Sequence, residues 1–286
     1  MGAGLVGFQT YEYARHFLSC CARQLGVEST PSGIQVEERF VSVQIFPVGL
    51  DYDRINTERQ SPAVRQTAET LSARFKDVKL IVGRDKLDHT KGLKHKMLAF
   101  ERFLTDFPQW RGKVVLLQIT IMPHAATDGD VRSPTPTGSL RQVAPLRGFT
   151  HPDTRQLIAS ISEVVNRVNA RFGSFDYTPI IHAQHEYGRE EELALFSIAD
   201  LCLVTAVRDG MNLTCQEYVV CQQEKHSPLL VSEFTGSAGS LGSAILINPW
   251  DYNETANAIN QALKLTPQEQ LTKYLVRVKC ERDVLY

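Results

Sequence analysis

Short apolar runs alternate with amphipathic stretches along the chain from about residue 78 onward. The runs predicted as buried strands cover residues 78–82, 113–119, 178–182, 201–205, 229–233 and 244–248. Apolar residues at near-helical spacing predict helices over residues 94–104, 155–172, 189–198, 213–223 and 251–263, the last with Asp251 as its N-cap. Short buried strands that alternate with helices indicate a parallel sheet covered on both faces. The chain is therefore expected to be an α/β protein with a Rossmann-like sheet.

Two parts of the chain do not follow this alternation. Residues 123–152 contain no periodic element and are rich in Pro, Thr, Ser and Gly. They are predicted to be either an irregular surface insertion or a stretch that is not native coding sequence. Residues 1–77 hold a predicted amphipathic helix over 11–25 and a β-rich stretch over 40–50. The expected parts are residues 1–77, a Rossmann-like domain over 78–265 and a helical tail over 266–286.

The composition is that of an ordinary folded domain with no strong charge bias. Apolar residues make up 43% of the 286 residues and charged residues 22%, and 31 basic residues nearly balance 32 acidic ones. Because the net charge is only −1, no global field attracts nucleic acid or an anionic membrane, and neither is expected as a partner. No apolar stretch in the sequence reaches the length of about 20 residues that a membrane span needs. The six cysteines form no CxxC pair, which favours a reducing, cytoplasmic setting.

A cation-rich segment follows the first predicted strand. Arg84, Lys86 and Lys91 lie between Gly83 and Gly92, and a predicted helix begins shortly after them. In parallel sheets ligands bind at the carboxyl ends of the strands, and a helix N-terminus adds positive potential there. Three cations in such a loop suit a diphosphate. The alternative is a solvated charged loop, and the spacing alone does not decide between the two.

The string RDGMN, over residues 208–212, is a second candidate segment. It follows a predicted strand and precedes a predicted helix, so its backbone N–H groups and the Asp209 carboxylate can face the hydroxyls of a sugar. Glu217 lies about one turn into that helix and is placed to accept hydrogen bonds from a ribose. The alternative is that Asp209 or Asn212 only caps the helix, as such residues commonly do.

A third segment, SEFTGSAGSLG over residues 232–242, is rich in small residues and also follows a predicted strand. It lacks the GxGxxG spacing of a dinucleotide fingerprint. A flexible loop near a ligand and an ordinary β–α connection both fit this composition.

Two histidines, His182 and His185, lie at the end of another predicted strand. The chain has no HExxH string, and no third ligand is apparent near the pair. No metal site is therefore expected there.

Five strings along the chain resemble, in order, the trehalose-6-phosphate synthase family. They are GFQTYEYARHF (7–17), VGRDKLDHTKG (82–92), RDGMNLTCQEYVVCQ (208–222), SEFTGSAGSL (232–241) and INPWD (247–251). The resemblance covers nearly the whole chain apart from residues 123–152. It implies a GT-B-type glycosyltransferase fold, of which this chain is expected to hold mainly the carboxyl-terminal nucleotide-sugar domain. Residues 1–77 are then expected to be a remnant of the amino-terminal domain with the connecting segment.

The resemblance also implies a reaction and the residues that carry it. The family transfers glucose from UDP-glucose to glucose 6-phosphate with retention of configuration, and it needs no metal or other cofactor. The motif positions place diphosphate binding on Lys86 and Lys91, which together with Asp209 are the expected catalytic residues. The expected UDP-glucose contacts are Lys86, Lys91, Asp209, Gly210, Met211, Asn212, Leu213 and Glu217. Arg167 matches a basic residue that the family places near the acceptor phosphate.

Two residues depart from the DRLDYxKG-like string of the family. Lys86 stands where arginine is usual, and His89 stands where tyrosine is usual. Lysine keeps the charge of arginine but loses its bidentate geometry. Because most of the amino-terminal domain is expected to be missing, the chain alone is not expected to turn over. The alternative function is a non-catalytic regulatory or scaffolding domain of a trehalose synthase and phosphatase complex, whose other subunits would be its partners.

Overall fold

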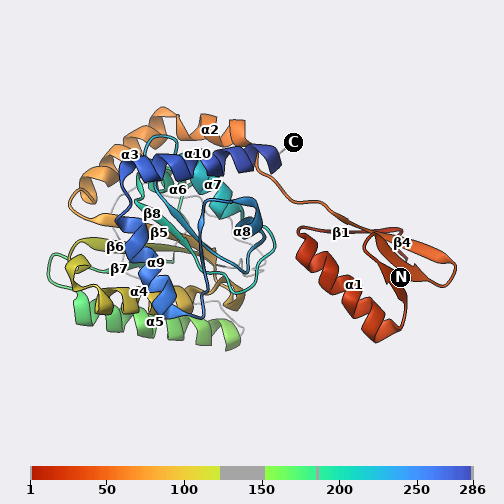
Figure 1. Ribbon diagram of the computed structural model, residues 1–286. Coiled ribbons are helices and arrows are strands. Elements are labelled where there is room, and N and C mark those ends of the chain that lie inside the picture. The colour runs from red at the N-terminus through yellow and green to blue at the C-terminus, as the bar shows by residue number, and fades with distance from the viewer. Residues whose placement is uncertain (1, 123–151, 185–186, 285–286) are drawn as a thin grey trace, which may run out of the picture.

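The computed structural model describes residues 2–122, 152–184 and 187–284, which form two bodies of unequal size (Figure 1). The larger body is built on a six-stranded sheet, and the smaller one on a four-stranded sheet near the N-terminus. One stretch of chain between the small sheet and the first helix of the large body joins them (Figure 1). The predicted insertion over residues 123–152 falls almost wholly outside the described residues.

The large sheet is parallel throughout and has the strand order of a Rossmann fold. Its strands are β5 (Lys79–Lys86), β6 (Val114–Ile121), β7 (Ile180–Ala183), β8 (Leu201–Val204), β9 (Leu229–Ser232) and β10 (Ile245–Ile247). They are arranged β10-β9-β8-β5-β6-β7, so the chain builds outward from β5 in one direction and then outward from β8 in the other. The order reverses between β5 and β8, and such a switch point is where open parallel sheets bind ligands.

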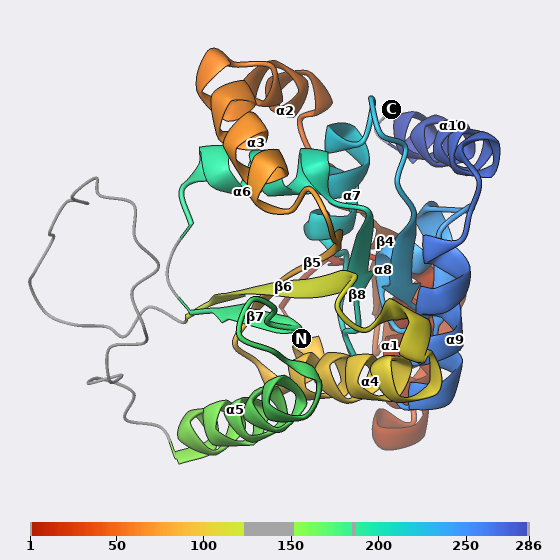
Figure 2. The ribbon, with the colours of Figure 1, turned by 90° about the vertical axis from the view of Figure 1, so that its left-hand side faces the viewer.

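Helices cover both faces of this sheet because its strands are apolar on both sides. One face carries α4 (Leu93–Asp106), α5 (Pro152–Phe172) and α9 (Tyr252–Leu263). The other face carries α2 (Tyr52–Arg59), α3 (Pro62–Arg74), α6 (Arg189–Ile198), α7 (Leu213–Cys221) and α10 (Pro267–Val284). Figure 2 shows the two helical layers on opposite sides of the strands. Two separate apolar clusters fill the layers, with Ile81 in one and its neighbours Leu80 and Val82 in the other.

The small body packs one helix against a mixed sheet. The sheet has the order β1-β4-β3-β2, and its strands are β1 (Leu5–Phe8), β2 (Glu28–Thr30), β3 (Gly33–Val36) and β4 (Arg39–Ile45). Helix α1 (Tyr11–Leu25) buries Ala14, Leu18 and Cys21 against this sheet, and these residues form a third apolar cluster with Ile34 and Val41. The helix ends at Gly26, which adopts the left-handed conformation that favours glycine.

The predicted elements are confirmed with small shifts at their ends. Helices α1 and α6 have the predicted bounds, and Asp251 accepts hydrogen bonds from the backbone of the first turn of α9. Two differences matter for the site. Strand β5 continues to Lys86, four residues beyond the predicted end at residue 82. Helices α2 and α3, over residues predicted to hold no helix, pack on the large sheet. In the described part of the chain, no helix is both long and apolar enough to span a membrane.

Candidate functional site

The loops that follow β5 and β8 are joined through their backbones at the switch point of the large sheet. The amide N–H of Val207 donates to the carbonyl of Thr90 over 2.8 Å, and the hydroxyl of Thr205 donates to the carbonyl of Gly92 over 3.1 Å. Gly92 has a φ of 65°, and a Cβ built on it would lie 1.9 Å from the carbonyl oxygen of Thr205. Only glycine can combine this left-handed backbone with such a close approach. The two loops therefore form a single rim.

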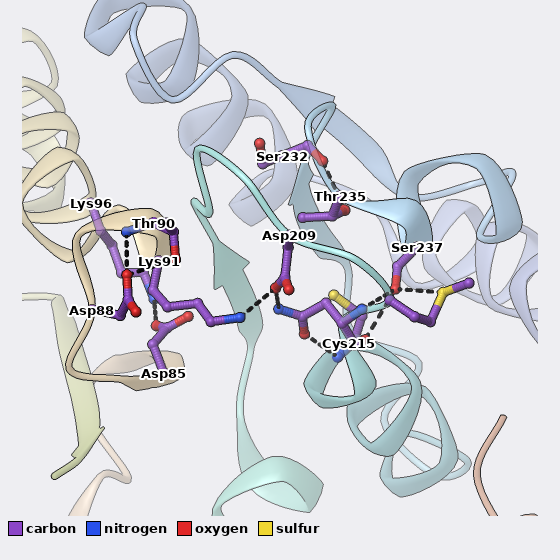
Figure 3. A network of polar contacts seen from close by, with 12 residues as sticks. Asp85, Asp88, Thr90, Lys91, Lys96, Asp209, Cys215, Ser232, Thr235 and Ser237 are labelled. Carbon is purple, nitrogen blue, oxygen red and sulfur yellow. Dashed lines mark hydrogen bonds and ion pairs between the residues drawn. The ribbon is translucent and has the colours of Figure 1, made fainter. Parts of the chain in front are cut away.

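An ion pair between Lys91 and Asp209 bridges the same two loops through their side chains (Figure 3). The Nζ of Lys91 lies 2.7 Å from Oδ2 of Asp209, and the two side chains are 21% and 11% exposed. The same Oδ2 also accepts a hydrogen bond of 2.9 Å from Nδ2 of Asn212. Both groups are largely withdrawn from water, so their attraction is stronger than that of an exposed surface pair. The structure thus brings together three of the residues that the sequence predicted.

Asn212 caps helix α7, as one of the two sequence interpretations of this residue predicted, and its contact with a sugar stays a prediction. Its Oδ1 accepts from the backbone N–H of Cys215, while its Nδ2 donates to Asp209. One side chain thereby fixes the start of the helix and the orientation of the carboxylate next to it. Leu213 is the first residue of α7, and its side chain is partly exposed. Backbone N–H groups of the first turn of a helix are ready donors to an anion or a sugar hydroxyl.

The small-residue segment after β9 packs directly against the loop that carries Asp209. The N–H of Gly236 donates to the carbonyl of Gly210 over 2.6 Å, and a Cβ on Gly236 would lie 2.6 Å from that oxygen. The hydroxyl of Ser237 contacts the backbone of Asn212 and the sulfur of Met211 (Figure 3). The segment forms the short helix α8 (Gly236–Ser240). The segment is therefore a β–α connection, and its nearness to a ligand stays a prediction.

Glu217 lies in α7 and is held by two arginines. Its Oε2 accepts from Nη1 of Arg84 over 2.9 Å, and its Oε1 accepts from Nη1 of Arg189 over 3.0 Å. Arg84 also donates from Nε to Glu192 over 2.9 Å. The expectation that Arg84 belongs to a strand-end loop was wrong, because β5 continues to Lys86 and Arg84 points from within the strand toward α6 and α7. Alternation of side chains along a strand places Arg84 on the same face as Val82.

A buried ion pair lies on the opposite face of β5, and the sequence analysis did not identify it. The Nζ of Lys96 lies 2.6 Å from Oδ2 of Asp85 and donates to Oε1 of Gln118 over 2.8 Å. Gln118 in turn donates from Nε2 to Asp85. A Cβ on Gly83 would lie 2.4 Å from both Lys96 Nζ and Gln118 Oε1, which explains glycine at this position. The pair ties α4 to the strand that ends at Lys86, one of the two candidate diphosphate residues.

The remaining two predicted site residues lie further from this cluster of contacts. The side chain of Lys86 is exposed at the end of β5 and forms no ion pair with any residue that the structure describes. Arg167 lies on α5 and pairs in a bidentate manner with Glu101 of α4, over 2.9 and 2.7 Å. Its hydrogen bonds to Glu101 raise the pKa of the Arg167 guanidinium.

His182 is half-buried near the end of β7 and shares a hydrogen bond of 2.9 Å with the hydroxyl of Thr120. Burial lowers the pKa of its imidazole from 6.5 to about 4, so the ring is neutral at pH 7. Its neighbour in the sequence motif, His185, lies outside the described residues. Among the residues with described positions, no three His, Cys, Asp or Glu side chains gather as a metal site would require.

The N-terminal body touches the rim at its RDGMN loop. The hydroxyl of Tyr13, in α1, donates to the carbonyl oxygen of Asp209 over 2.6 Å. The side chain of Gln9 lies beside Gly210, since a Cβ on that glycine would be 3.7 Å from Gln9 Cγ. Thr10 approaches Gly236 in the same way, at 2.6 Å. The rim is thus contacted from a part of the chain in which the sequence analysis assigned no site residue.

Comparison with protein families gives one match that covers nearly the whole chain. The model described as glycosyltransferase family 20 matches residues 1–134 and 137–279. Among curated proteins, the chain is 41% identical over 271 residues to the α,α-trehalose-phosphate synthase (UDP-forming) of Schizosaccharomyces pombe. That alignment covers 94% of this chain and 48% of the relative. The chain therefore spans about half the length of that relative.

Solved structures with the same fold come from fungal and bacterial proteins. The N-terminal domain of Candida albicans trehalose-6-phosphate phosphatase matches with a TM-score of 0.86 and 35% identity, over 99% of this chain and 55% of that one. An α,α-trehalose-phosphate synthase (UDP-forming) from Burkholderia xenovorans, solved in complex with glucose-6-phosphate, matches with a TM-score of 0.85 and 28% identity. The second match covers 98% of this chain and 58% of the bacterial one. These likenesses confirm the α/β fold of the GT-B glycosyltransferases that the sequence predicted.

Proposed function

Because the chain belongs to glycosyltransferase family 20, we propose that it forms the UDP-glucose-binding half of a retaining α,α-trehalose-phosphate synthase. The observation that carries the proposal is the ion pair of Lys91 with Asp209, which joins the two loops at the switch point of the sheet. A cation and a carboxylate side by side match a ligand with a diphosphate at one end and sugar hydroxyls at the other. The substrates would be UDP-glucose as donor and glucose 6-phosphate as acceptor.

In this proposal each loop supplies one part of the donor site. Lys86 and Lys91 bind the diphosphate and stabilise the negative charge of the departing UDP, an electrostatic role that uses no metal or cofactor. The exposed ammonium of Lys86 is available for this role. Asp209 and the backbone from Gly210 to Leu213 hold the transferred glucose. Since Lys91 already pairs with Asp209, UDP-glucose would enter a site whose charges are oriented beforehand.

The remaining assignments concern the acceptor, the domain boundaries and the surroundings of the protein. The Burkholderia relative binds glucose-6-phosphate, which supports the same acceptor class here. Arg167 would contact the acceptor phosphate only by sharing its guanidinium with Glu101. We keep residues 78–265 as the proposed nucleotide-sugar domain, with 1–77 and 266–286 as flanking parts. The proposed setting is the cytoplasm, with other subunits of a trehalose complex as candidate partners.

Calorimetric titration with UDP and with UDP-glucose tests the donor site. Saturable binding is expected, and Lys91→Ala should weaken it by at least about tenfold, because charge-assisted hydrogen bonds to a diphosphate are among the stronger ones. Lys264→Ala is the matched control, since it removes an exposed lysine at the far end of α9. Asp209→Asn removes the carboxylate that is proposed to hold the sugar but keeps the cation of Lys91. It therefore tests the sugar contact separately from the diphosphate contact. A folded protein that binds neither ligand would overturn the proposal.

A second candidate function is a regulatory or scaffolding domain without catalysis. The observation that favours it is the 35% identity to the N-terminal domain of a trehalose-6-phosphate phosphatase, at a TM-score of 0.86. Lys86 and His89, which differ from the usual family string, point the same way. A chain that is folded by circular dichroism but binds no UDP-glucose would favour this function. Release of UDP in the presence of glucose 6-phosphate would exclude it.

A further inference from the structure

Four charged side chains form a compact network between β5, α6 and α7, and one of them, Arg189, also pairs with Glu58 of α2 over 3.2 Å. Arg84 bridges two carboxylates, with Nε 2.9 Å from Glu192 and Nη1 2.9 Å from Glu217. Arg189 approaches Glu217 from the other side, over 3.0 Å. Three of the four side chains are less than about a quarter exposed, so these contacts are largely shielded from water. The network lies on the opposite face of β5 from the buried pair of Lys96 and Asp85.

The geometry leaves Glu217 oriented but not saturated. Each of its two carboxylate oxygens accepts one arginine N–H. A carboxylate offers about four lone-pair directions, so about two remain for further donors. The arginines cannot rotate away together without leaving both Glu192 and Glu217 unpaired in a partly buried space. The free lone pairs of Glu217 therefore point in directions that the protein sets in advance.

The network also places two carboxylates beside each other, and Arg84 contacts both. Burial raises the pKa of Glu192, the charge of Glu217 raises it further, and the guanidinium of Arg84 opposes both effects. Without Arg84, two neighbouring carboxylates would share one partly buried space, and the pKa of Glu192 would rise further.

We propose that Arg84 and Arg189 are positioning residues that hold Glu217 as an oriented acceptor for the ribose hydroxyls of a uridine nucleotide. This inference rests on the proposed function and adds to it a separation of diphosphate binding from recognition of the ribose. Lys86 and Lys91 would bind the diphosphate, while the arginine-held Glu217 would select a nucleotide with an intact ribose. Arg84 and Arg189 would act only through Glu217.

The test compares three ligands by calorimetry: UDP, UDP whose ribose lacks both hydroxyls, and inorganic pyrophosphate. The full chain should prefer UDP over the dideoxy analogue by at least about tenfold, the usual effect of hydrogen bonds to a charged acceptor. In Arg84→Met this preference should fall below about threefold, while the affinity for pyrophosphate changes by less than about twofold. A general loss of structure would lower all three affinities together, so the ratio isolates the positioning role.

Two further variants keep the test decisive. Arg84→Lys retains the charge but offers one ammonium in place of a two-pronged guanidinium, so an intermediate preference is expected even if Arg84→Met fails to fold. Arg102→Met is the matched control, because it removes an exposed arginine whose ion-pair partner among the described residues is Asp106 on its own helix. If both Arg84 variants keep the full preference for UDP, the inference is wrong while the proposed donor site stands. If the unaltered chain binds neither UDP nor pyrophosphate, the proposed function fails and the inference fails with it.

Discussion

The hydroxyl of Tyr13 donates a 2.6 Å hydrogen bond to the backbone carbonyl of Asp209, a residue 196 positions later in the chain. The bond joins the small N-terminal body to the loop that carries the candidate sugar-binding carboxylate. Helix α1 therefore contacts the part of the large body in which the described site residues gather. The contact uses the backbone of Asp209, so it restrains the loop and leaves the carboxylate free to pair with Lys91.

Removing the Tyr13 hydroxyl should loosen the RDGMN loop. Tyr13→Phe deletes one hydrogen bond with a typical net value of about 1 kcal/mol, so the dissociation constant for UDP-glucose should rise by about fivefold. The measurement is calorimetric titration of the purified chain. Tyr11→Phe is the control, because that tyrosine is 60% exposed at the start of the same helix. Equal affinities for both variants would show that this contact does not order the loop.

The two roles of Asn212 can be separated by substitution. Asn212→Ala removes both the helix cap and the donor to Asp209, and it should lower the free energy of unfolding by about 1 kcal/mol. Asn212→Ser can still cap α7 but has no amide to orient the carboxylate. We expect Asn212→Ser to restore stability in urea denaturation while UDP-glucose affinity stays reduced. Recovery of both quantities would indicate that capping is the only role of this residue.

Gly92 and Gly112 form a natural pair for testing the contact between the loops. Both have positive φ, 65° and 75°, but a Cβ on Gly112 meets no atom within 4 Å. Gly112→Ala should therefore cost only the backbone strain, about 1–2 kcal/mol. Gly92→Ala adds a clash with the carbonyl of Thr205, so its loss of unfolding free energy should be clearly larger. Similar losses in the two variants would contradict the close approach described here.

The half-buried ring of His182 should make stability fall in mild acid. Its pKa is about 4 in the folded protein and near 6.5 when unfolded, so only the unfolded chain gains a proton as pH drops from 6.5 to 4. Above pH 6.5 the ring is neutral in both states and contributes no pH dependence. The free energy of unfolding should decline by about 3 kcal/mol more for the unaltered chain than for His182→Gln between pH 7 and pH 4. Parallel pH profiles from denaturant titrations would refute this.

Most of the large body could be predicted because its strands and helices bury regular stripes of apolar residues. Helices α2 and α3 could not be found in this way, since α3 buries only Val64 and α2 only Ile55 and Arg59. Their capping residues were the available signal. Asp51 and Ser61 each accept a hydrogen bond from the backbone of the first turn, and Pro62 begins α3.

The site was predictable as a set of residues but not as a set of contacts. The motif strings identified Lys91, Asp209 and Glu217, and the reversal of strand order brings their loops together. The partners of Arg84 lie 108 and 133 positions away, on helices whose separation in space no local pattern encodes. If the predicted strand had been extended by two residues beyond residue 82, the alternation of its side chains would have placed Arg84 on the buried face instead of in the loop.

Arg84 and Asp85 are neighbours in the chain, and the pleat of β5 sends their side chains to opposite helical layers. A one-residue insertion or deletion inside β5 would exchange the two faces and disrupt both charge networks at once. Substitutions at single positions would disturb only one layer. Strand β5 is therefore expected to tolerate substitutions better than changes in its length. Loop grafts at this edge of the sheet should join the chain after residue 86. A change in length there leaves the alternation of side chains along β5 unchanged.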